Sequence, residues 1–99
     1  MSDTNDRIEA ISITSPGHVM RLDRAKFEAM RDALLSVLPE DAPGITVAEA
    51  KKRLLERLPQ AQFPNGEKAG WWLKAVQLDQ EARGVIKRAT GSPVRLYRV

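Results

Sequence analysis

The stretch of this sequence that could do chemistry is KAGWWLKAVQLDQEARGVIKR, residues 68–88. Read as a helix, it places a leucine, a lysine and two glutamines on one arc: Leu73, Lys74, Gln77 and Gln80. Glutamine can pair with adenine, and an apolar side chain can contact the methyl group of thymine. The arc therefore predicts a face that reads a nucleic-acid groove, although Glu81 on the same arc opposes this interpretation.

Positive charge gathers in the same part of the chain. Residues 1–65 hold nine Lys/Arg against ten Asp/Glu, whereas residues 66–99 hold seven against three. From Val85 onward there are four basic residues and no acidic one: Lys87, Arg88, Arg95 and Arg98. Such a segment could contact the phosphates of a polyanion. A solvated basic hairpin is an equally good interpretation of the charge alone.

Both tryptophans of the chain stand side by side in this stretch. Within about 40° of one helical line lie four apolar residues: Trp71, Ala75, Leu78 and Ala82. The two alanines leave room for another helix, so we expect Trp71 to be a core residue. Trp72 lies about a quarter turn away and is expected to be half-buried, with a functional surface aromatic as the alternative. Asp79, near Trp72, then needs a partner, either the Trp72 indole or an arginine of the C-terminal hairpin.

Two helices are predicted upstream of this stretch. Asp23 is a natural N-cap, and apolar residues recur after it at helical spacing, which predicts a helix over about 24–38. Thr46 and Glu49 form a capping box in which each side chain bonds to the other residue's backbone amide. The box opens a second predicted helix over about 47–58.

The third helix and the strands complete the predicted elements. The third helix is expected over about 67–83, with Gly84 where a left-handed cap belongs. A β-hairpin is predicted over 7–22 and a second over 85–98, and Ile45 has room for a strand of one or two residues.

Alternation along the last strand limits the basic surface. Val94 and Leu96 should face the core together with Arg98, while Arg95 faces outward. Lys87 and Arg88 are adjacent and point to opposite faces. Four or five cations could then contact phosphate together, which predicts a slope of roughly −4 for log K against log salt.

The composition indicates one soluble α+β domain over residues 7–99, preceded by a disordered tail over 1–6. There is no cysteine, and His18 is the only histidine, so neither a metal site nor a cofactor is expected. Phosphate-loop and dinucleotide motifs are missing, and ordinary turn and capping chemistry explains NGEKAG. We therefore expect no enzyme and no small-molecule substrate. With no signal peptide and no apolar stretch that could span a membrane, the expected location is the cytoplasm.

The order of these elements resembles the winged helix-turn-helix superfamily over about residues 23–99. The resemblance is carried by FEAMRDALLSVL, GITVAEAKKRLLERL, WWLKAVQLDQEARGVIKR and SPVRLYRV. The AGWW and ARG motifs are also similar to those of a family of small, uncharacterised bacterial single-domain proteins. The superfamily resemblance implies a three-helix winged helix, here with an additional N-terminal hairpin, in which the third helix enters the major groove.

The resemblance adds Lys68 to the groove-facing candidates Leu73, Lys74, Gln77 and Gln80. It also implies that the basic residues of the C-terminal hairpin, the wing, meet phosphates. The turn PQAQFPNGE is longer than that of a simple helix-turn-helix, so the groove geometry departs from the superfamily pattern.

A protein-interaction or dimerisation module of the same fold is the alternative function, because a fold does not fix its use. An exposed Leu73, the open edge of the N-terminal hairpin and the acidic Asp79 and Glu81 would all suit a protein partner or a second copy of the chain.

Overall fold

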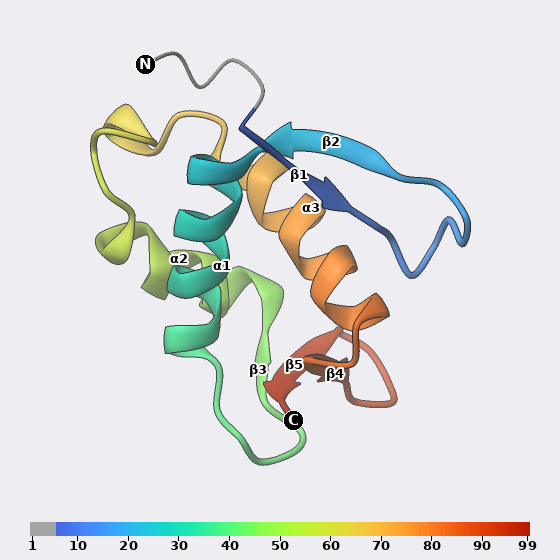
Figure 1. The fold of residues 1–99 in the computed structure, drawn as a ribbon. Helices are drawn as coiled ribbons and strands as arrows, with labels where there is room; N and C mark the ends of the chain where they lie inside the picture. Colours follow the sequence, from blue (N-terminus) through green and yellow to red (C-terminus); the bar gives the residue numbers. More distant parts are fainter. Residues whose placement is uncertain (1–5) are drawn as a thin grey trace.

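The computed structural model describes residues 6–99, which form three helices and two small antiparallel sheets (Figure 1). The elements, in chain order, are β1 (Arg7–Ala10), β2 (Met20–Asp23), α1 (Arg24–Val37), β3 (Ile45–Thr46), α2 (Val47–Leu54), α3 (Ala69–Ala82), β4 (Ile86–Arg88) and β5 (Arg95–Arg98). The predicted α+β class is confirmed. Apart from Asp6, the tail predicted over 1–6 lies outside the described residues; the Asp6 carboxylate is 2.7 Å from Arg24 Nε.

Helix α1 follows the prediction closely. The Asp23 carboxylate accepts a hydrogen bond from the amide of Lys26 at 2.9 Å, which satisfies one of the free donors of the first turn. The apolar residues of the helix bury one face, which includes Phe27, Met30 and Leu34. This face packs against α3 and α2.

Helix α2 has the Thr46 half of the predicted capping box and ends earlier than predicted. Thr46 Oγ1 accepts from the amide of Glu49 at 3.1 Å, but the Glu49 carboxylate is bonded to Arg53 Nε at 2.7 Å. This contact lowers the pKa of Glu49, first through the hydrogen bond and then through the positive charge of Arg53. The helix ends at Leu54, and a 3₁₀ turn over Leu55–Arg57 completes the predicted span.

Helix α3 starts two residues later and ends one residue earlier than predicted, with the glycine cap where it was expected. A 3₁₀ turn over Pro64–Gly66 precedes it, and Lys68, with φ of 60°, marks its start. At the other end Gly84 has φ of 77° and donates to Glu81 O, while Val85 donates to Gln80 O. These two bonds are those of a Schellman cap, which satisfies the last carbonyls of the helix.

The two sheets contain the predicted hairpins and the short predicted strand at Ile45. In the first sheet β1 pairs with β2, and in the second the strand order is β3-β5-β4. Ile45 pairs with Leu96, and Arg88 pairs with the same residue from the other side. The predicted alternation in β5 is confirmed, because Leu96 is fully buried and Arg95 is exposed.

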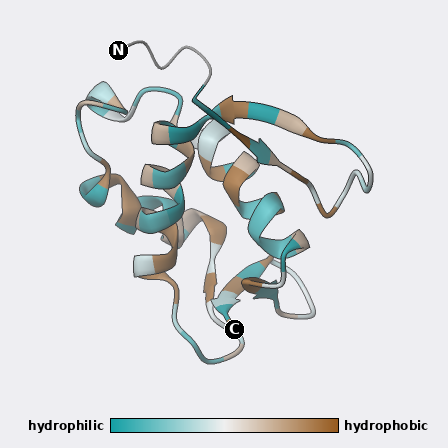
Figure 2. Cartoon of the chain, viewed as in Figure 1, coloured by the Kyte–Doolittle hydropathy of each residue, from teal (hydrophilic) through white to brown (hydrophobic). Residues whose placement is uncertain are grey.

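The core lies between the three helices and the inner face of the second sheet. Its largest fully buried side chains include Phe27, Phe63, Leu54 and Ile86. Hydrophobic residues follow the inner sides of the helices and also occur along the β1–β2 hairpin (Figure 2). Because this hairpin lies beside α3 and the second sheet lies at the far end of that helix (Figure 1), α3 is covered from several directions.

Candidate functional site

A groove of about 560 Å³ runs along the exposed side of α3. Apolar residues of three elements line it: Val47, Leu73, Leu78 and Val94. Thr14 of the β1–β2 loop bounds it, as do Lys51 of α2 and Arg88 of β4. The groove therefore combines apolar lining with positive charge, and residues of α2, α3 and both hairpins line it.

Lys51 and Lys74 supply the exposed charge of the groove. The Thr46 N-cap fixes where α2 begins, and Lys51 lies about one turn after that start. Its Nζ atom lies against Gly70, since a Cβ built on that glycine would be only 3.4 Å away. Lys74 lies one turn after Gly70 on the exposed side of α3. Among residues 6–99, neither lysine forms a salt bridge with an acidic side chain.

Arg88 contributes to the groove as a structural ion pair. Its Nε and Nη2 atoms contact the two carboxylate oxygens of Glu81 at 2.7 and 2.8 Å. Gln77 Nε2 donates to the same carboxylate at 2.9 Å, and the Glu81 side chain is only 3% exposed. The hydrogen bond to Glu81 raises the pKa of Arg88. The pair fastens β4 to α3 and compensates the charge of Arg88, so the net charge of the groove comes from the two lysines.

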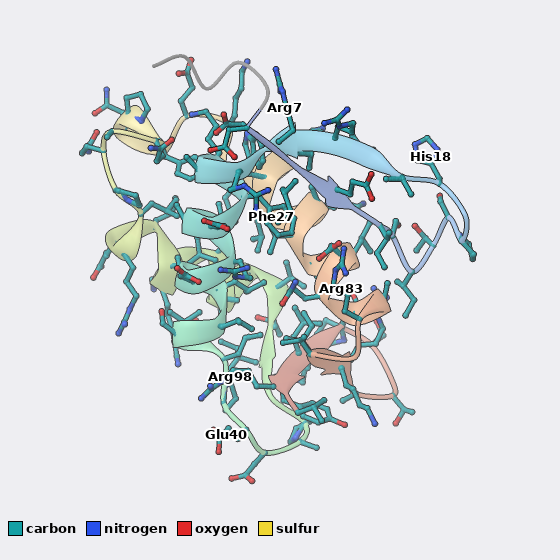
Figure 3. All side chains as sticks on the ribbon, in the orientation of Figure 1. Arg7, His18, Phe27, Glu40, Arg83 and Arg98 are labelled. Atoms are coloured by element: carbon teal, nitrogen blue, oxygen red, sulfur yellow. The ribbon has the colours of Figure 1, made fainter. Side chains whose placement is uncertain are left out.

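Asp79 fixes the N-terminal hairpin to the opposite flank of α3. Its buried carboxylate accepts from the Ile11 amide at 2.8 Å, from Gln80 Nε2 at 2.9 Å and from Arg83 Nε at 2.9 Å. Arg83 also donates to Glu9 O at 3.0 Å; Figure 3 shows this arginine between the end of α3 and the hairpin. The expected partners, Trp72 or an arginine of the C-terminal hairpin, were wrong, because the β1–β2 loop approaches Asp79 first.

An aromatic row leads from the core to the surface at the start of α3. Phe63 is buried and meets Trp72 edge-on at a centroid distance of 6.3 Å. Trp72 in turn meets Trp71 edge-on at 5.2 Å. The expectation that Trp72 is half-buried is confirmed.

Trp71 was expected in the core, and this is wrong, because it is 51% exposed. The line Trp71–Ala75–Leu78–Ala82 faces away from α1, and only Ala75 of these four packs against the core. The reason is that polar side chains occupy much of the buried arc of α3, so its most apolar line is not its buried one.

The expectation that Leu73, Gln77 and Gln80 are exposed on a reading face is also wrong, since all three are buried. Leu73 packs in the core, while the two glutamines donate to Glu81 and Asp79 respectively. They are buried because α3 is covered by the second sheet on one flank and by the hairpin on another. In this position they hydrogen-bond within the protein.

The nine predicted site residues do not share one surface. Four of them line the groove: Leu73, Lys74, Gln77 and Arg88. Lys87 and Arg95 are exposed and alternate with inward-facing residues of β4 and β5, which places them on the outer face of the sheet. Arg98 points elsewhere, donating to Leu38 O at 3.0 Å and pairing with Glu40 at 3.2 Å (Figure 3). Lys68 is exposed at the start of α3.

The sequence interpretation missed Lys51 as a site residue. Lys51–Arg53 is a basic run in the sequence, but at helical spacing its three side chains diverge around α2, which indicates a solvated face and not a site. Only Lys51 of the three lines the groove. The signal that could have selected it is Gly70, which permits a side chain to cross α3 at that turn.

Two further features bear on the kind of site this is. Within residues 6–99, no group of three or more His, Asp or Glu side chains is placed to hold a metal ion. His18 stands alone at the outer end of the β1–β2 loop (Figure 3). No helix in the described part of the chain is long and apolar enough to cross a membrane.

Fold and groove together define a small α+β domain in which a central helix, flanked by two hairpins, carries a positively charged groove. The chain belongs to DUF6958, a family of unknown function whose model matches residues 7–96. No curated protein and no solved structure matches the chain.

Proposed function

We propose that the protein is a winged helix of the cytoplasm that binds nucleic acid through the groove beside α3. The order of elements supports the fold assignment: helix, short strand, two helices and then a two-stranded hairpin. On this proposal α2 and α3 form the helix-turn-helix, and β4–β5 is the wing. The protein takes no catalytic step and needs no cofactor.

The observation that carries the proposal is the pair of exposed lysines, Lys51 and Lys74, on an apolar groove with no free carboxylate among its lining residues. The one acidic group nearby, Glu81, is buried and neutralised by Arg88. Phosphate oxygens would meet the ammonium groups of both lysines there, and the release of counterions from the nucleic acid would favour binding.

Burial of Gln77 and Gln80 changes the expected mode of binding. Because neither glutamine of α3 is free to pair with a base, contacts to the phosphate backbone dominate, and such contacts position a nucleic acid without reading its sequence. The groove cations then predict a slope of about −2 to −3 for log K against log salt. This is shallower than expected from the sequence, because Lys87 and Arg95 face another side.

The test is a titration of labelled mixed-sequence DNA, offered as duplex and as single strand, at about 50 and about 200 mM salt. A Lys51→Ala/Lys74→Ala variant should lose roughly two units of the salt slope. The charge-matched control is Lys52→Ala/Arg57→Ala, since Lys52 of α2 and Arg57 of the 3₁₀ turn after it line a different depression and not the groove. If neither form of DNA binds, or if both variants weaken binding equally, the proposal is wrong.

A protein-interaction module is the second candidate, favoured by the exposed apolar residues of the N-terminal hairpin. Ile13, Val19 and Met20 are each more than a third exposed. Ile13 and Val19 lie in the loop that joins β1 and β2, and Met20 begins β2, in a two-stranded sheet with open edges. A second copy of the chain could pair with that edge. Sedimentation of the protein alone, with Val19→Lys as the variant, separates this function from nucleic-acid binding, which the same substitution should leave intact.

A further inference from the structure

We propose that the bound nucleic acid is single-stranded, with one base stacked on Trp71 and the adjacent phosphates on Lys74 and Lys51. This inference rests on the proposed function and specifies its ligand. It starts from the exposure of Trp71, which is the most exposed aromatic residue of the described chain.

Trp71 is exposed but supported from below. Trp72 contacts it edge-on at 5.2 Å, and Trp72 is itself held edge-on by Phe63 in the core. Lys26 lies over the Phe63 ring, 5.1 Å from its centroid, and donates to Gln62 O, which fixes the turn that carries Phe63. An aromatic side chain held in this way loses little conformational freedom when a base stacks on it, so more of the stacking energy remains as affinity.

The charge around Trp71 matches a strand whose bases and phosphates alternate. Lys74 stands three residues after it, one helical turn away, and Lys68, the residue just before the helix, stands three residues before it. Lys51 Nζ lies against Gly70, the residue that precedes Trp71 in the chain. Sequence-tolerant binding of single strands uses this combination, in which an aromatic side chain stacks a base and cations follow the backbone.

The surroundings of α3 disfavour a duplex. A recognition helix must enter a major groove about 12 Å wide, which requires that it protrude from its domain. Here Thr14 of the β1–β2 loop and Val94 next to β5 both line the groove along α3. The loop is held against the helix by the hydrogen bond from the Ile13 amide to Leu78 O at 3.2 Å. The helix is therefore recessed between two loops, and a flexible single strand fits the groove better than a rigid duplex.

The first measurement uses Trp72→Phe, a variant in which Trp71 is the only tryptophan. Its fluorescence is followed during titration with an oligothymidylate of about 12 nucleotides, a length within the usual site sizes. Stacking of a base should quench the emission. Unchanged emission at saturating binding would overturn the proposal.

The second measurement compares Trp71→Leu with Trp71→Phe. The leucine variant keeps an apolar side chain but cannot stack, and it should weaken oligothymidylate binding roughly 5- to 100-fold. The phenylalanine variant should retain most of the affinity. Both variants should have melting temperatures close to that of the unmodified protein, because half of the Trp71 side chain is exposed to solvent. Equal affinities of the two variants would also overturn the proposal.

The third comparison separates this inference from the proposed function. The single strand should bind more tightly than a duplex of the same length. If the duplex binds as well, and binding depends on Lys51 and Lys74 but not on Trp71, the single-strand inference is wrong while the proposed function stands. If neither form binds, both are wrong.

Discussion

Asp79→Asn should be among the most destabilising conservative substitutions in this protein. The carboxylate is fully buried and accepts from the Ile11 amide, Gln80 and Arg83. Asparagine keeps the volume but replaces one acceptor oxygen with an NH₂ group, which faces donors on every side. A hydrogen bond to a charged group contributes about 1.5–3 kcal/mol, and a buried donor left without a partner costs a similar amount.

The contribution of Arg83 must be discounted, because its side chain is 45% exposed and rehydrates when the partner is neutralised. The remaining bonds give an expected loss of about 2–4 kcal/mol in the free energy of unfolding. Since a domain of this size has roughly 5–15 kcal/mol in total, the melting temperature should fall by about 10 °C or more.

Urea denaturation measures this loss, with Asp32→Asn as the matched control, because the Asp32 side chain is mostly exposed and its carboxylate pairs with the neighbouring Arg31 at the surface. The control should change stability by less than about 0.5 kcal/mol. Amide exchange at Ile11 should accelerate in Asp79→Asn alone. A loss no larger than that of the control, with Ile11 still protected, would refute the assignment of Asp79 as the residue that holds the hairpin.

Two other substitutions test the close contacts around the second sheet. Gly44→Ala should lower the free energy of unfolding by about 3 kcal/mol or more, because a Cβ on this residue would stand 1.8 Å from Leu96 O, at a φ of 81°. Gly17 has a similar φ but no neighbour within 4 Å of such a Cβ. Gly17→Ala should therefore lower the free energy of unfolding by only about 1–2 kcal/mol in the same urea titration. Glu81→Gln should lower stability by about 1–2 kcal/mol but free the charge of Arg88, so DNA titration should give a salt slope steeper by up to about one.

Local signals in the sequence predicted most elements of the fold. Asp23 and Thr46 start helices because a side-chain oxygen next to free amides is stabilising in any surroundings. Gly84 ends α3 because a residue without Cβ tolerates positive φ. Such signals depend on a few neighbouring residues, and for that reason they can be read without the tertiary structure.

The orientation of α3 could not be predicted in the same way. Its hydrophobic line through Trp71, Ala75 and Leu78 satisfied the usual criterion for a buried face, yet the helix buries Gln77, Gln80 and two carboxylates. A buried polar residue is acceptable only when its partner is present. The Ile11 amide that bonds to Asp79 is 68 residues away in sequence, and Arg88, which bonds to Glu81, lies beyond the end of the helix, on β4. Periodicity carries no information about partners of that kind.

The turn between α2 and α3 illustrates the same limit. Its sequence, PQAQFPNGE, is rich in turn-forming residues and predicts a loop, which is what the backbone forms. Phe63 within it is nevertheless one of the largest fully buried side chains. A single aromatic residue in a polar loop has no period, so nothing in its spacing indicates that it supports Trp72.

Burial of the polar residues of α3 and exposure of Trp71 have one cause. Asp79 and Glu81 attach a hairpin to each flank of α3, and these attachments use the polar side chains that a groove-reading helix would present to DNA. What remains accessible is the outward apolar line and the lysines beside it. A surface of this composition offers stacking and phosphate contacts but no hydrogen-bond readout, so a ligand bound there would be chosen for its charge and its exposed bases rather than for its sequence.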